Sequence, residues 1–350
     1  MVTNPLAADL DHVLERTESL WTDLRGERIF ITGGTGFTGR WLLEAFAWAN
    51  DRLRLGASAL VLTRNPDAFA GKAPHLAVHP AIQFHRGDVR TFAFPAGEFS
   101  SVIHAATESS LKLTLDDPRL MFDTIVDGTR RALEFARACR ARAFLLTSSG
   151  AVYGRQPSHL THLAEDYQGG PDPTDPRFVY GSGKRAAETL CALYAGGGLE
   201  PKIARGFTFV GPHLPIDSHF AVGNFIRDAL AGGPIRVHGD GTPYRSYLYA
   251  ADLVIWLLTI LLRGKPMRPY NVGSGDDLTI KALADLVAAG RSPALAVTVA
   301  KPPIPGAAPE RYVPSVARAQ AELGLQPTIS LTESLTRTLA WHAGVAANAC

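Results

Sequence analysis

A tyrosine and a lysine four residues apart, Tyr180 and Lys184, are the strongest chemical signal in this sequence. Side chains at this spacing lie on one face of a helix, so both can reach a single substrate. An ammonium beside a phenol favours the phenolate and lowers the tyrosine pKa towards neutral pH. The pair therefore predicts a general acid or base that interconverts a carbonyl and an alcohol. An exposed helix face without chemistry is the alternative.

A serine-rich segment, Thr147–Gly154, precedes this pair and reads TSSGAVYG. It follows an apolar run that is typical of a strand, which places Ser149 at the carboxyl end of that strand. A hydroxyl there can hydrogen-bond a reacting oxygen and share its proton with Tyr180. A serine that caps a turn is the alternative interpretation.

A glycine cluster lies near the start of the chain, where Arg28–Gly39 reads RIFITGGTGFTG and a helical pattern follows. Gly33, Gly36 and Gly39 have the spacing GxxGxxG. The first glycine allows a tight turn, the second lets a pyrophosphate approach, and the third lets the helix pack on the strand. The first turn of that helix offers unpaired N–H groups to phosphate. The segment predicts a dinucleotide site.

The end of the second predicted strand, Ser58–Thr63, bears on the choice of cofactor. NAD sites usually carry an acidic residue there, which accepts hydrogen bonds from the adenine ribose 2′-hydroxyl. Arg64 follows the strand instead, and a guanidinium can pair with the 2′-phosphate of NADP. The sequence therefore favours NADP over NAD, with a solvated surface arginine as the alternative.

The order of predicted elements supplies a scaffold for these groups. Apolar segments alternate with helical patterns, which is typical of a parallel sheet with right-handed crossovers. Besides the strand that begins at Arg28, the predicted strands are 58–63, 82–85, 102–104, 143–147 and 202–204, and the predicted helices are 8–21, 40–48, 118–141 and 178–194. We expect an α/β fold, namely a Rossmann-type doubly wound parallel sheet with a smaller C-terminal substrate-binding lobe.

The predicted domains follow from a change in texture after residue 210. Residues 1–26 form a leader helix, and residues 27–210 form the NAD(P)-binding Rossmann domain with the catalytic residues. Prolines become frequent from residue 211 onward. We therefore assign 211–350 mainly to the substrate lobe, with segments at about 245–275 returning to the Rossmann domain.

Composition excludes several other classes of protein. The net charge is +2, from 35 basic and 33 acidic residues, so no nucleic-acid or anionic-membrane partner is expected. The longest apolar run, Leu253–Leu262, is too short to span a bilayer. Three scattered cysteines favour reduced thiols and a cytoplasmic location. The pairs His75 with His79 and His159 with His162 lack acidic or cysteine partners, so we expect no metal site.

Taken together, these segments resemble the extended short-chain dehydrogenase/reductases of the NAD-dependent epimerase/dehydratase family, which act on nucleotide sugars. The resemblance covers about Glu27 to His342. Its motifs are Thr32–Gly39, Gly87–Arg90, Val102–Thr107, Thr147–Gly154, Tyr180–Lys184, Gly239–Gly241, Arg245–Tyr247 with Asp252, Tyr270–Gly273 and Leu323–Leu325 before Trp341. It implies an NAD(P)-dependent epimerase or oxidoreductase that binds a nucleoside-diphosphate sugar and forms a homodimer.

The resemblance implies a role for each matching residue. Tyr180 is the catalytic acid/base, Lys184 holds the nicotinamide ribose and tunes Tyr180, and Ser149 assists. The residues assigned to the cofactor are Gly33, Gly36, Phe37, Thr38, Gly39, Arg64, Asp88, Val89, Ala105, Ala106, Tyr180 and Lys184. Those assigned to the substrate are Glu108, Ser109, Ser149, Thr208, Asn224, Arg245 and Arg311, with the neighbouring Ser110. The two arginines suit a diphosphate, because guanidinium pairs with phosphate oxygens bidentately.

Departures from the family pattern narrow the reaction. The 4,6-dehydratases have an Asp-Glu pair where this chain has Gly150 and Ala151, and neither residue can transfer a proton. The glutamate of the xylose-forming decarboxylase and the cysteine of the 3,5-epimerising reductase would both coincide with Ala151. What remains is hydride transfer at sugar C4 with Tyr180 as acid/base, in a C4 epimerase or a 4-keto-sugar reductase.

Two alternatives stay open. An NADPH-dependent reductase of a non-nucleotide carbonyl, of the dihydroflavonol-reductase type, is disfavoured by Arg245 and Gly239–Gly241. A non-catalytic NAD(P)-sensing protein is disfavoured by the intact Ser149, Tyr180 and Lys184. Thr208 and Ile125 both replace family asparagines, so the substrate geometry can differ from that of relatives; they stand in the segments RGFT and TIVDGT.

Overall fold

The chain consists of two compact units in the computed structural model, which describes residues 4–107, 114, 116–218 and 220–348. The first unit comprises Met1–Gly154, Gly170–Gly206 and Leu253–Tyr270, and the second comprises Arg155–Gly169, Phe207–Asp252 and Asn271–Cys350. Arg155–Gly169 lies inside the range predicted for the Rossmann domain but belongs to the second unit. Each unit is described on its own below.

The first unit is built on a parallel sheet. The strands of this sheet are β1 (Arg28–Thr32), β2 (Ser58–Thr63), β3 (Ile82–Arg86), β4 (Ser101–His104), β5 (Ala143–Ser149), β6 (Glu200–Gly206) and β11 (Pro269–Val272), of which Pro269 and Tyr270 belong to this unit. The seven strands have the order β11-β6-β5-β4-β1-β2-β3, and the pairs from β3 to β6 are parallel. The chain winds outward from β1 in one direction and from β4 in the other, which confirms the predicted doubly wound sheet.

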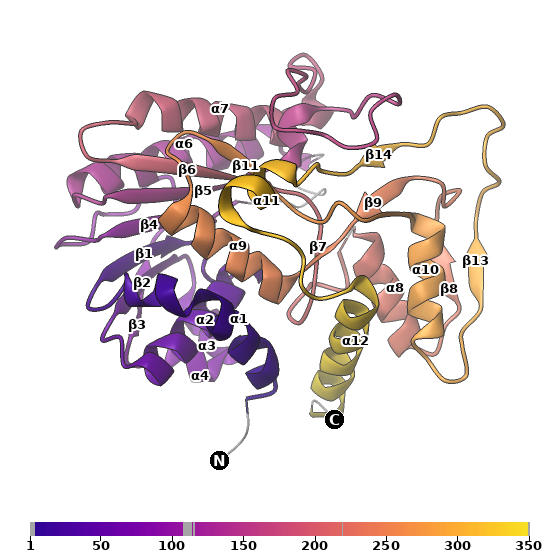
Figure 1. The fold of residues 1–350 in the computed structure, drawn as a ribbon, viewed down its shortest axis with the longest axis horizontal. Helices are drawn as coiled ribbons and strands as arrows, with labels where there is room; N and C mark the ends of the chain where they lie inside the picture. The colour runs from indigo at the N-terminus through magenta and orange to yellow at the C-terminus, as the bar shows by residue number, and fades with distance from the viewer. Residues whose placement is uncertain (1–3, 108–113, 115, 219, 349–350) are drawn as a thin grey trace. The chain divides into compact units, whose positions relative to one another are not determined.

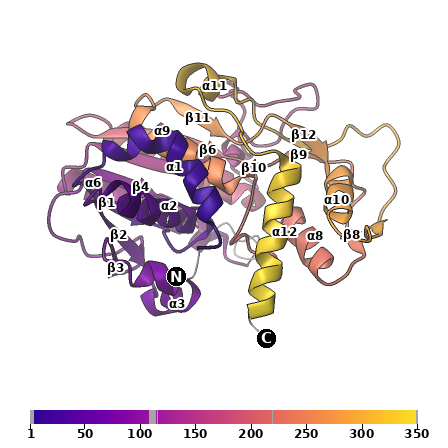
Figure 2. The same cartoon turned by 60° about the horizontal axis from the view of Figure 1, so that its bottom comes forward.

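Helices cover both faces of this sheet (Figures 1 and 2). They are α1 (Ala7–Thr22), α2 (Phe37–Leu53), α3 (Pro66–Lys72), α4 (Pro74–Ala77), α6 (Pro118–Ala138), α7 (Val179–Tyr194) and α9 (Ala250–Arg263). The helices α6 and α7 lie side by side on one face, and α1, α2 and the end of α9 lie on the other. Among the described residues, no helix is long and apolar enough to cross a membrane.

Aromatic side chains fill the core between β1 and α6. Phe30, at the centre of β1, lies 4.5 Å from Phe135, 5.5 Å from Phe92 and 5.8 Å from Phe99, measured between ring centroids. All four rings are almost completely buried. Strands that are buried on both faces have continuous apolar sequences. For this reason the alternation of strands and helices along the chain was predictable from the sequence.

The N-terminal helix α1 packs against α2. Leu10, Val13 and Trp21 of α1 are buried, and Trp48 Nε1 of α2 donates to Asp11 Oδ1 over 2.8 Å. Burial of such apolar side chains stabilises the unit by about 1.5–3 kcal/mol for each side chain. The helix is therefore an integral layer of the first unit.

The described residues of the second unit form short strands and helices. Its strands are β7 (Phe209–Val210), β8 (Ile235–Val237), β9 (Tyr244–Ser246), β10 (Leu248–Tyr249), β12 (Asp277–Thr279), β13 (Val297–Val299) and β14 (Arg311–Tyr312). Its helices are α8 (Ala221–Leu230), α10 (Ile280–Ala289), α11 (Ala317–Leu323) and α12 (Leu331–Asn348). The strands form one three-stranded sheet, β12-β9-β14, and two pairs, β10-β7 and β13-β8, while α8 packs against α10 and α12.

Candidate functional site

The glycine turn joins β1 to α2. Gly33 has φ of +71°, and a Cβ there would lie 2.4 Å from the carbonyl carbon of Ala105. A Cβ on Gly39 would lie 2.2 Å from the Gly33 carbonyl oxygen, so neither position admits a side chain. A Cβ on Gly36 would lie 3.5 Å from the same oxygen, which is an ordinary van der Waals contact. Space beside Gly36 is therefore left for a ligand, as the dinucleotide prediction requires.

The first turn of α2 presents backbone N–H groups beside this space. Phe37 and Thr38 begin the helix, and the N-cap residue Gly36 supplies no side-chain hydrogen bond. By contrast, Asp117 caps α6 through a 3.0 Å bond from Leu120 N. Because the first four N–H groups of a helix lack internal partners, the α2 turn can donate to an anion.

A buried hydrogen-bond chain supports the turn from below. Thr129 Oγ1 donates to the Ile125 carbonyl over 2.7 Å and therefore accepts from His104 Nε2 over 3.0 Å. His104 Nδ1 is then free of a proton and accepts from Thr32 Oγ1 over 2.8 Å. The Ala106 N–H completes the chain by donating to Thr32 Oγ1 over 3.1 Å. Burial lowers the pKa of His104 to about 3, so the ring stays neutral.

An acidic residue with two arginines near it follows β3. Arg90 holds Asp88 bidentately, with Nε 2.9 Å from Oδ1 and Nη2 3.1 Å from Oδ2. These bonds lower the pKa of Asp88, and the charge of Arg64 lowers it further. Val89 packs against α6 at Gly128, where a Cβ would lie 2.9 Å from Val89 Cγ1. Arg64 and Asp88 therefore lie close enough to interact, as a shared site at the end of the sheet requires.

The proposed acid/base group touches the proposed helper hydroxyl. Tyr180 is half-buried on α7 and is hydrogen-bonded to the Ser149 side chain. The Ser149 hydroxyl also accepts from Ala151 N over 3.1 Å, which fixes its position at the end of β5. Burial raises the pKa of Tyr180, while the bond with Ser149 opposes that rise. The sequence predicted a lowered pKa for Tyr180, so burial outweighs the effect expected from Lys184.

Lys184 lies one helical turn along α7 and is only 3% exposed. Its Nζ donates to the Thr147 carbonyl over 2.7 Å and lies 5.8 Å from the centre of the Tyr180 ring. Burial lowers the pKa of Lys184 to about 8, so its charge depends on pH near neutrality. The structure thus brings Ser149, Tyr180 and Lys184 together in the first unit.

The turn that follows Ser149 is held tightly against α7. This turn is the 3₁₀ helix η1 (Gly150–Tyr153), and a Cβ on Gly181 would lie 2.5 Å from the Ala151 carbonyl oxygen. Arg185 Nη1 donates to the Val152 carbonyl over 3.0 Å. Only a glycine at position 181 allows the helix to approach so closely, and this approach sets the distance between Tyr180 and Ser149.

Two charged residues beside this group were missed in the sequence. Glu188 of α7 and Arg205 of β6 form an ion pair with a 2.7 Å contact, and both are largely buried. The available signal was the spacing of Glu188, which stands four residues after Lys184 on the same helix face.

In the second unit, the two predicted phosphate-binding arginines lie on neighbouring strands. Arg311 of β14 is in register with Tyr244 of β9, and Arg245 is in register with Tyr312. Since paired residues share a face, Arg245 and Arg311 leave the sheet on opposite faces. Arg311 accordingly stacks on Tyr244, 3.9 Å from the ring centroid.

Each of these arginines already has a carboxylate partner. Arg245 Nη2 lies 2.7 Å from Glu310 Oε1, and Arg311 Nη1 lies 2.5 Å from Asp277 Oδ2. The Glu310 side chain is 69% exposed, whereas that of Asp277 is 25% exposed. The ion pair of Arg245 is therefore the more exposed of the two, and exposed ion pairs contribute little to stability.

The remaining predicted substrate residues differ in their surroundings. Among the described residues, the buried hydroxyl of Thr208 has no hydrogen-bond partner, and the Thr208 carbonyl accepts from Leu248 N. Asn224 of α8 accepts from Arg227 Nη1 over 3.0 Å. Glu108 and Ser109, like Ser110, lie outside the described residues. A buried hydroxyl without a partner, as at Thr208, suits contact with a polar ligand.

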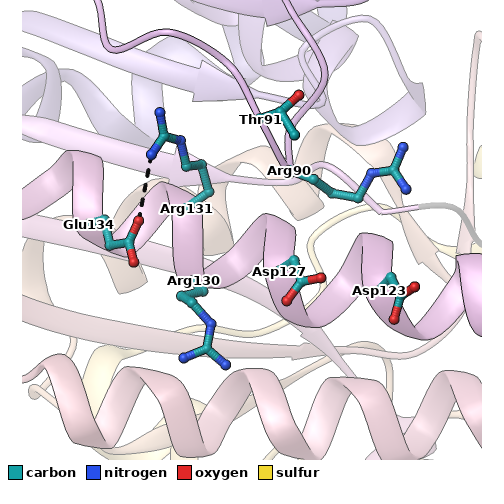
Figure 3. Close-up of a pocket in the computed structure, with 7 residues that line it drawn as sticks. All are labelled: Arg90, Thr91, Asp123, Asp127, Arg130, Arg131 and Glu134. Carbon is teal, nitrogen blue, oxygen red and sulfur yellow. Dashed lines mark ion pairs between the residues drawn. The ribbon is translucent and has the colours of Figure 1, made fainter.

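A charged groove of about 570 Å³ lies along α6 and was not predicted. Its lining residues are Arg90, Thr91, Asp123, Asp127, Arg130, Arg131 and Glu134. Figure 3 shows Arg131 turned towards Glu134, to which it is paired over 3.7 Å. Acidic and basic side chains are balanced, so the groove has no clear preference for an ion of one sign.

The described residues also contain no group of three or more His, Cys, Asp or Glu side chains that could hold a metal.

Comparison with known proteins gives consistent matches. Residues 29–273 match the model of the NAD dependent epimerase/dehydratase family. The chain is 32% identical to UDP-glucuronic acid decarboxylase 1 of Arabidopsis thaliana over 314 residues, which are 89% of this chain and 68% of that protein. It is 31% identical to UDP-glucuronic acid decarboxylase 1 of Danio rerio over 320 residues, 89% of this chain and 72% of that protein. The solved UDP-glucose 4-epimerase of Thermus thermophilus in complex with NAD is 27% identical, with a TM-score of 0.72 and coverage of 91% and 99%.

Proposed function

The chain belongs to the NAD dependent epimerase/dehydratase family, and from this premise we propose that it is an NAD(P)-dependent enzyme that oxidises and reduces C4 of a nucleoside-diphosphate sugar. One observation carries the proposal. Tyr180 is hydrogen-bonded to Ser149, and the buried Lys184 lies one turn away on the same helix. This arrangement suits the interconversion of an alcohol and a ketone.

In the proposed reaction, Tyr180 takes the proton of the C4 hydroxyl and later returns it. When bound, the nicotinamide supplies the acceptor and donor of hydride. Ser149 shares its hydrogen bond between Tyr180 and the sugar oxygen, which orients that oxygen. Lys184 in its ammonium form favours the phenolate and holds a ribose hydroxyl. The space beside Gly36 and the N–H groups of α2 fit a pyrophosphate at the other end of the cofactor.

We propose that the reaction is limited to the oxidation and reduction of C4 and includes no decarboxylation, which the names of the curated relatives specify. Those proteins are named UDP-glucuronic acid decarboxylases. The family resemblance implies that such decarboxylases have a glutamate at the position of Ala151. Decarboxylation and dehydration of the oxidised sugar both call on an ionisable side chain there. Gly150 and Ala151 have none, which supports a C4 epimerase, the activity named for the Thermus protein.

A 4-keto-sugar reductase is the second candidate, and Arg64 is the observation that favours it. Arg64 is exposed at the end of β2, and its charge acts on Asp88. A guanidinium there suits the 2′-phosphate of NADPH, the cofactor that a reductase consumes. An epimerase instead regenerates its cofactor in each cycle, so NAD suffices.

We propose that the second unit binds the diphosphate of the substrate through Arg245, and that Arg311, on the opposite face of the sheet, contacts another part of the nucleotide. Arg245 would exchange Glu310 for a phosphate oxygen, since a charge-assisted bond to phosphate is stronger than an exposed ion pair. Arg311 and the buried hydroxyl of Thr208 are further polar groups for the nucleotide. Asn224, with Glu108 and Ser109, completes the proposed set.

We also propose a cytoplasmic homodimer that pairs through α6 and α7. Phe122 of α6 and Leu193 of α7 are large apolar side chains that are 37% and 71% exposed. A second copy would remove both from water. The free, buried thiols of Cys139 and Cys191 suit a reducing compartment. Light scattering of Leu193→Ser against the parent protein tests the pairing, because loss of an apolar contact should raise the monomer fraction.

Product analysis tests the proposed function. The purified protein is incubated with UDP-, dTDP-, CDP- and GDP-glucose and their C4 epimers, with NAD or NADP. It is also incubated with the 4-keto derivatives of these sugars and NADPH, and the sugars are separated by chromatography. We expect interconversion of C4 epimers for one nucleotide, or NADPH-dependent reduction of its 4-keto derivative. Release of carbon dioxide from a UDP-uronic acid, or full turnover by Tyr180→Phe, would overturn the proposal.

A further inference from the structure

A largely buried ion pair lies one helical turn beyond Lys184. Arg205 of β6 donates to Glu188 of α7 through two parallel bonds, Nε to Oε1 over 3.0 Å and Nη2 to Oε2 over 2.7 Å. The glutamate and arginine side chains are 12% and 13% exposed. Bidentate pairs of this kind fix both partners in one geometry.

Two further bonds tie the pair to the turn that carries Ser149. Ser148 Oγ donates to Glu188 Oε1 over 2.6 Å, and Arg205 Nη1 donates to the Tyr153 hydroxyl over 2.9 Å. Ser148 directly precedes Ser149, and Tyr153 ends η1. The ion pair therefore holds the turn at both of its ends.

The pair is also placed to hold the helix that carries the proposed acid/base group. Tyr180, Lys184 and Glu188 follow one another at intervals of four residues, so they share the helix face that meets β5 and β6. One carboxylate and one guanidinium thus link a strand, a turn and a helix. Packing alone does not call for charges here, because an apolar pair of similar size is often as stabilising as a buried ion pair.

Glu188 is the carboxylate whose charge acts on Lys184. Among the described residues, the titratable groups that act on Lys184 or are acted on by it are Glu188 and Cys191 of α7 and His104 of β4, with Tyr180 beside them. Burial keeps His104 neutral by lowering its pKa to about 3, and keeps Cys191 neutral by raising its pKa. Burial also raises the pKa of Tyr180, which favours its neutral form.

Glu188 therefore opposes the effect of burial on Lys184. Burial lowers the pKa of Lys184 to about 8, whereas the charge of Glu188 raises it. Arg205 partly cancels that charge, because it lies against the same carboxylate. Removing Glu188 or Arg205 should consequently shift the protonation of Lys184 in opposite directions.

We propose that Glu188 and Arg205 are positioning residues for the reaction: Glu188 keeps Lys184 in its ammonium form, Arg205 limits that effect, and the pair holds Ser149 against Tyr180. The relevance of this device to turnover rests on the proposed function. The protonation of Lys184 does not depend on it and can be measured directly.

Lysine NMR provides that measurement. The chain has only seven lysines, so protein labelled at lysine side chains gives few signals, and Lys184→Met identifies the one of interest. The titration is followed in the parent protein, Glu188→Gln, Arg205→Gln and the double variant. Glu98→Gln, which removes an exposed partner of Arg140, is the matched control. Circular dichroism and thermal melting establish that each variant is folded.

We expect Glu188→Gln to weaken proton binding by Lys184 about threefold or more, and Arg205→Gln to strengthen it. The double variant should return close to the parent value, and Glu98→Gln should not change it. Shifts of the same sign in both single variants, or no shift in folded Glu188→Gln, would overturn the proposal.

The pH profile of turnover separates this inference from the proposed function. Since the ammonium form of Lys184 is the active one, activity falls as pH rises through its pKa, and this fall should move to lower pH in Glu188→Gln. If the Lys184 signal shifts as expected but the pH profile does not follow, the positioning of charge stands and the proposed role of Lys184 in the reaction is wrong.

Discussion

The proposed chemical groups of the first unit and the proposed binding groups of the second differ in how they are held. Lys184 is buried, and its Nζ donates to a backbone carbonyl that cannot leave. Arg245 also donates to a backbone carbonyl, that of Tyr244, but its carboxylate partner Glu310 is 69% exposed. Lys184 is thus held by the backbone, while Arg245 has one exposed partner that a ligand can replace.

This difference has an energetic basis. An exposed ion pair contributes about 0–1 kcal/mol, so a phosphate can replace Glu310 at little cost. Buried polar groups that lose a partner cost about 1–3 kcal/mol, so the surroundings of Lys184 resist rearrangement. If the proposed function is correct, changes in the first group should lower turnover and changes in the second should weaken binding.

The largest expected effect is that of Lys184→Met. Methionine has a similar length but no charge, so the phenolate of Tyr180 and the ribose both lose their cation. We expect kcat to fall by about 100-fold or more, with the affinity for nucleoside diphosphate changed less than about twofold. Steady-state kinetics and calorimetry of diphosphate binding measure the two quantities. A rise in KM at constant kcat would break the comparison.

How far the sequence predicts this structure depends on the kind of element. The strand 58–63 and the helix that begins at Pro118 were predicted because buried parallel strands are continuous apolar runs and amphipathic helices repeat every 3.6 residues. The strands β9, β12 and β14 have two or three residues. Such strands have no period to detect, and their partners lie far along the chain.

The candidate site shows the same difference between features set by local sequence and features set by distant parts of the chain. Gly33 and Gly39 were predictable, because a tight turn and a close helix contact require glycine at fixed spacing. The pairing of Glu188 with Arg205 was not, because it depends on how β6 lies beside β5. The raised pKa of Tyr180 was missed for a related reason, since burial is a property of the fold rather than of the spacing of Tyr180 and Lys184.

Arg245→Ala should have the next largest effect. It tests the proposed binding groups of the second unit, as Lys184→Met tests the proposed chemical groups of the first. Loss of a charge-assisted bond to phosphate should raise KM for the nucleotide sugar about 10-fold to 100-fold, with kcat changed far less. Arg311→Ala is the matched variant, and we expect a smaller rise because Arg311 leaves the opposite face of the sheet. An equal loss of kcat in Arg245→Ala would place this arginine in the chemical step and remove the distinction.

Arg64→Ser tests whether the exposure of a residue, rather than the unit to which it belongs, decides whether its loss lowers turnover or weakens binding. Arg64 belongs to the first unit but is exposed, so it should behave as a recognition group. We expect the ratio of NADP to NAD affinity to fall about 10-fold, measured by fluorescence titration with both cofactors. Lys72→Ser, a change on the nearby helix α3, is the control. Tighter binding of NAD than of NADP by the parent protein would contradict the prediction.

Glu310→Gln is the smallest and most specific test, because it should improve function. In the structure Glu310 holds Arg245, so its carboxylate competes with the phosphate that we propose for the same guanidinium. Glutamine keeps the size of the side chain and removes that competition. We expect nucleoside diphosphate to bind about twofold to fivefold more tightly, with the gain shrinking as salt screens the exposed charges.

Asp285→Gln, which removes the exposed partner of Lys281, should leave the affinity unchanged. Weaker binding in Glu310→Gln would mean that Glu310 positions Arg245 for the ligand instead of competing with it, and the second unit would then be as preorganised as the first.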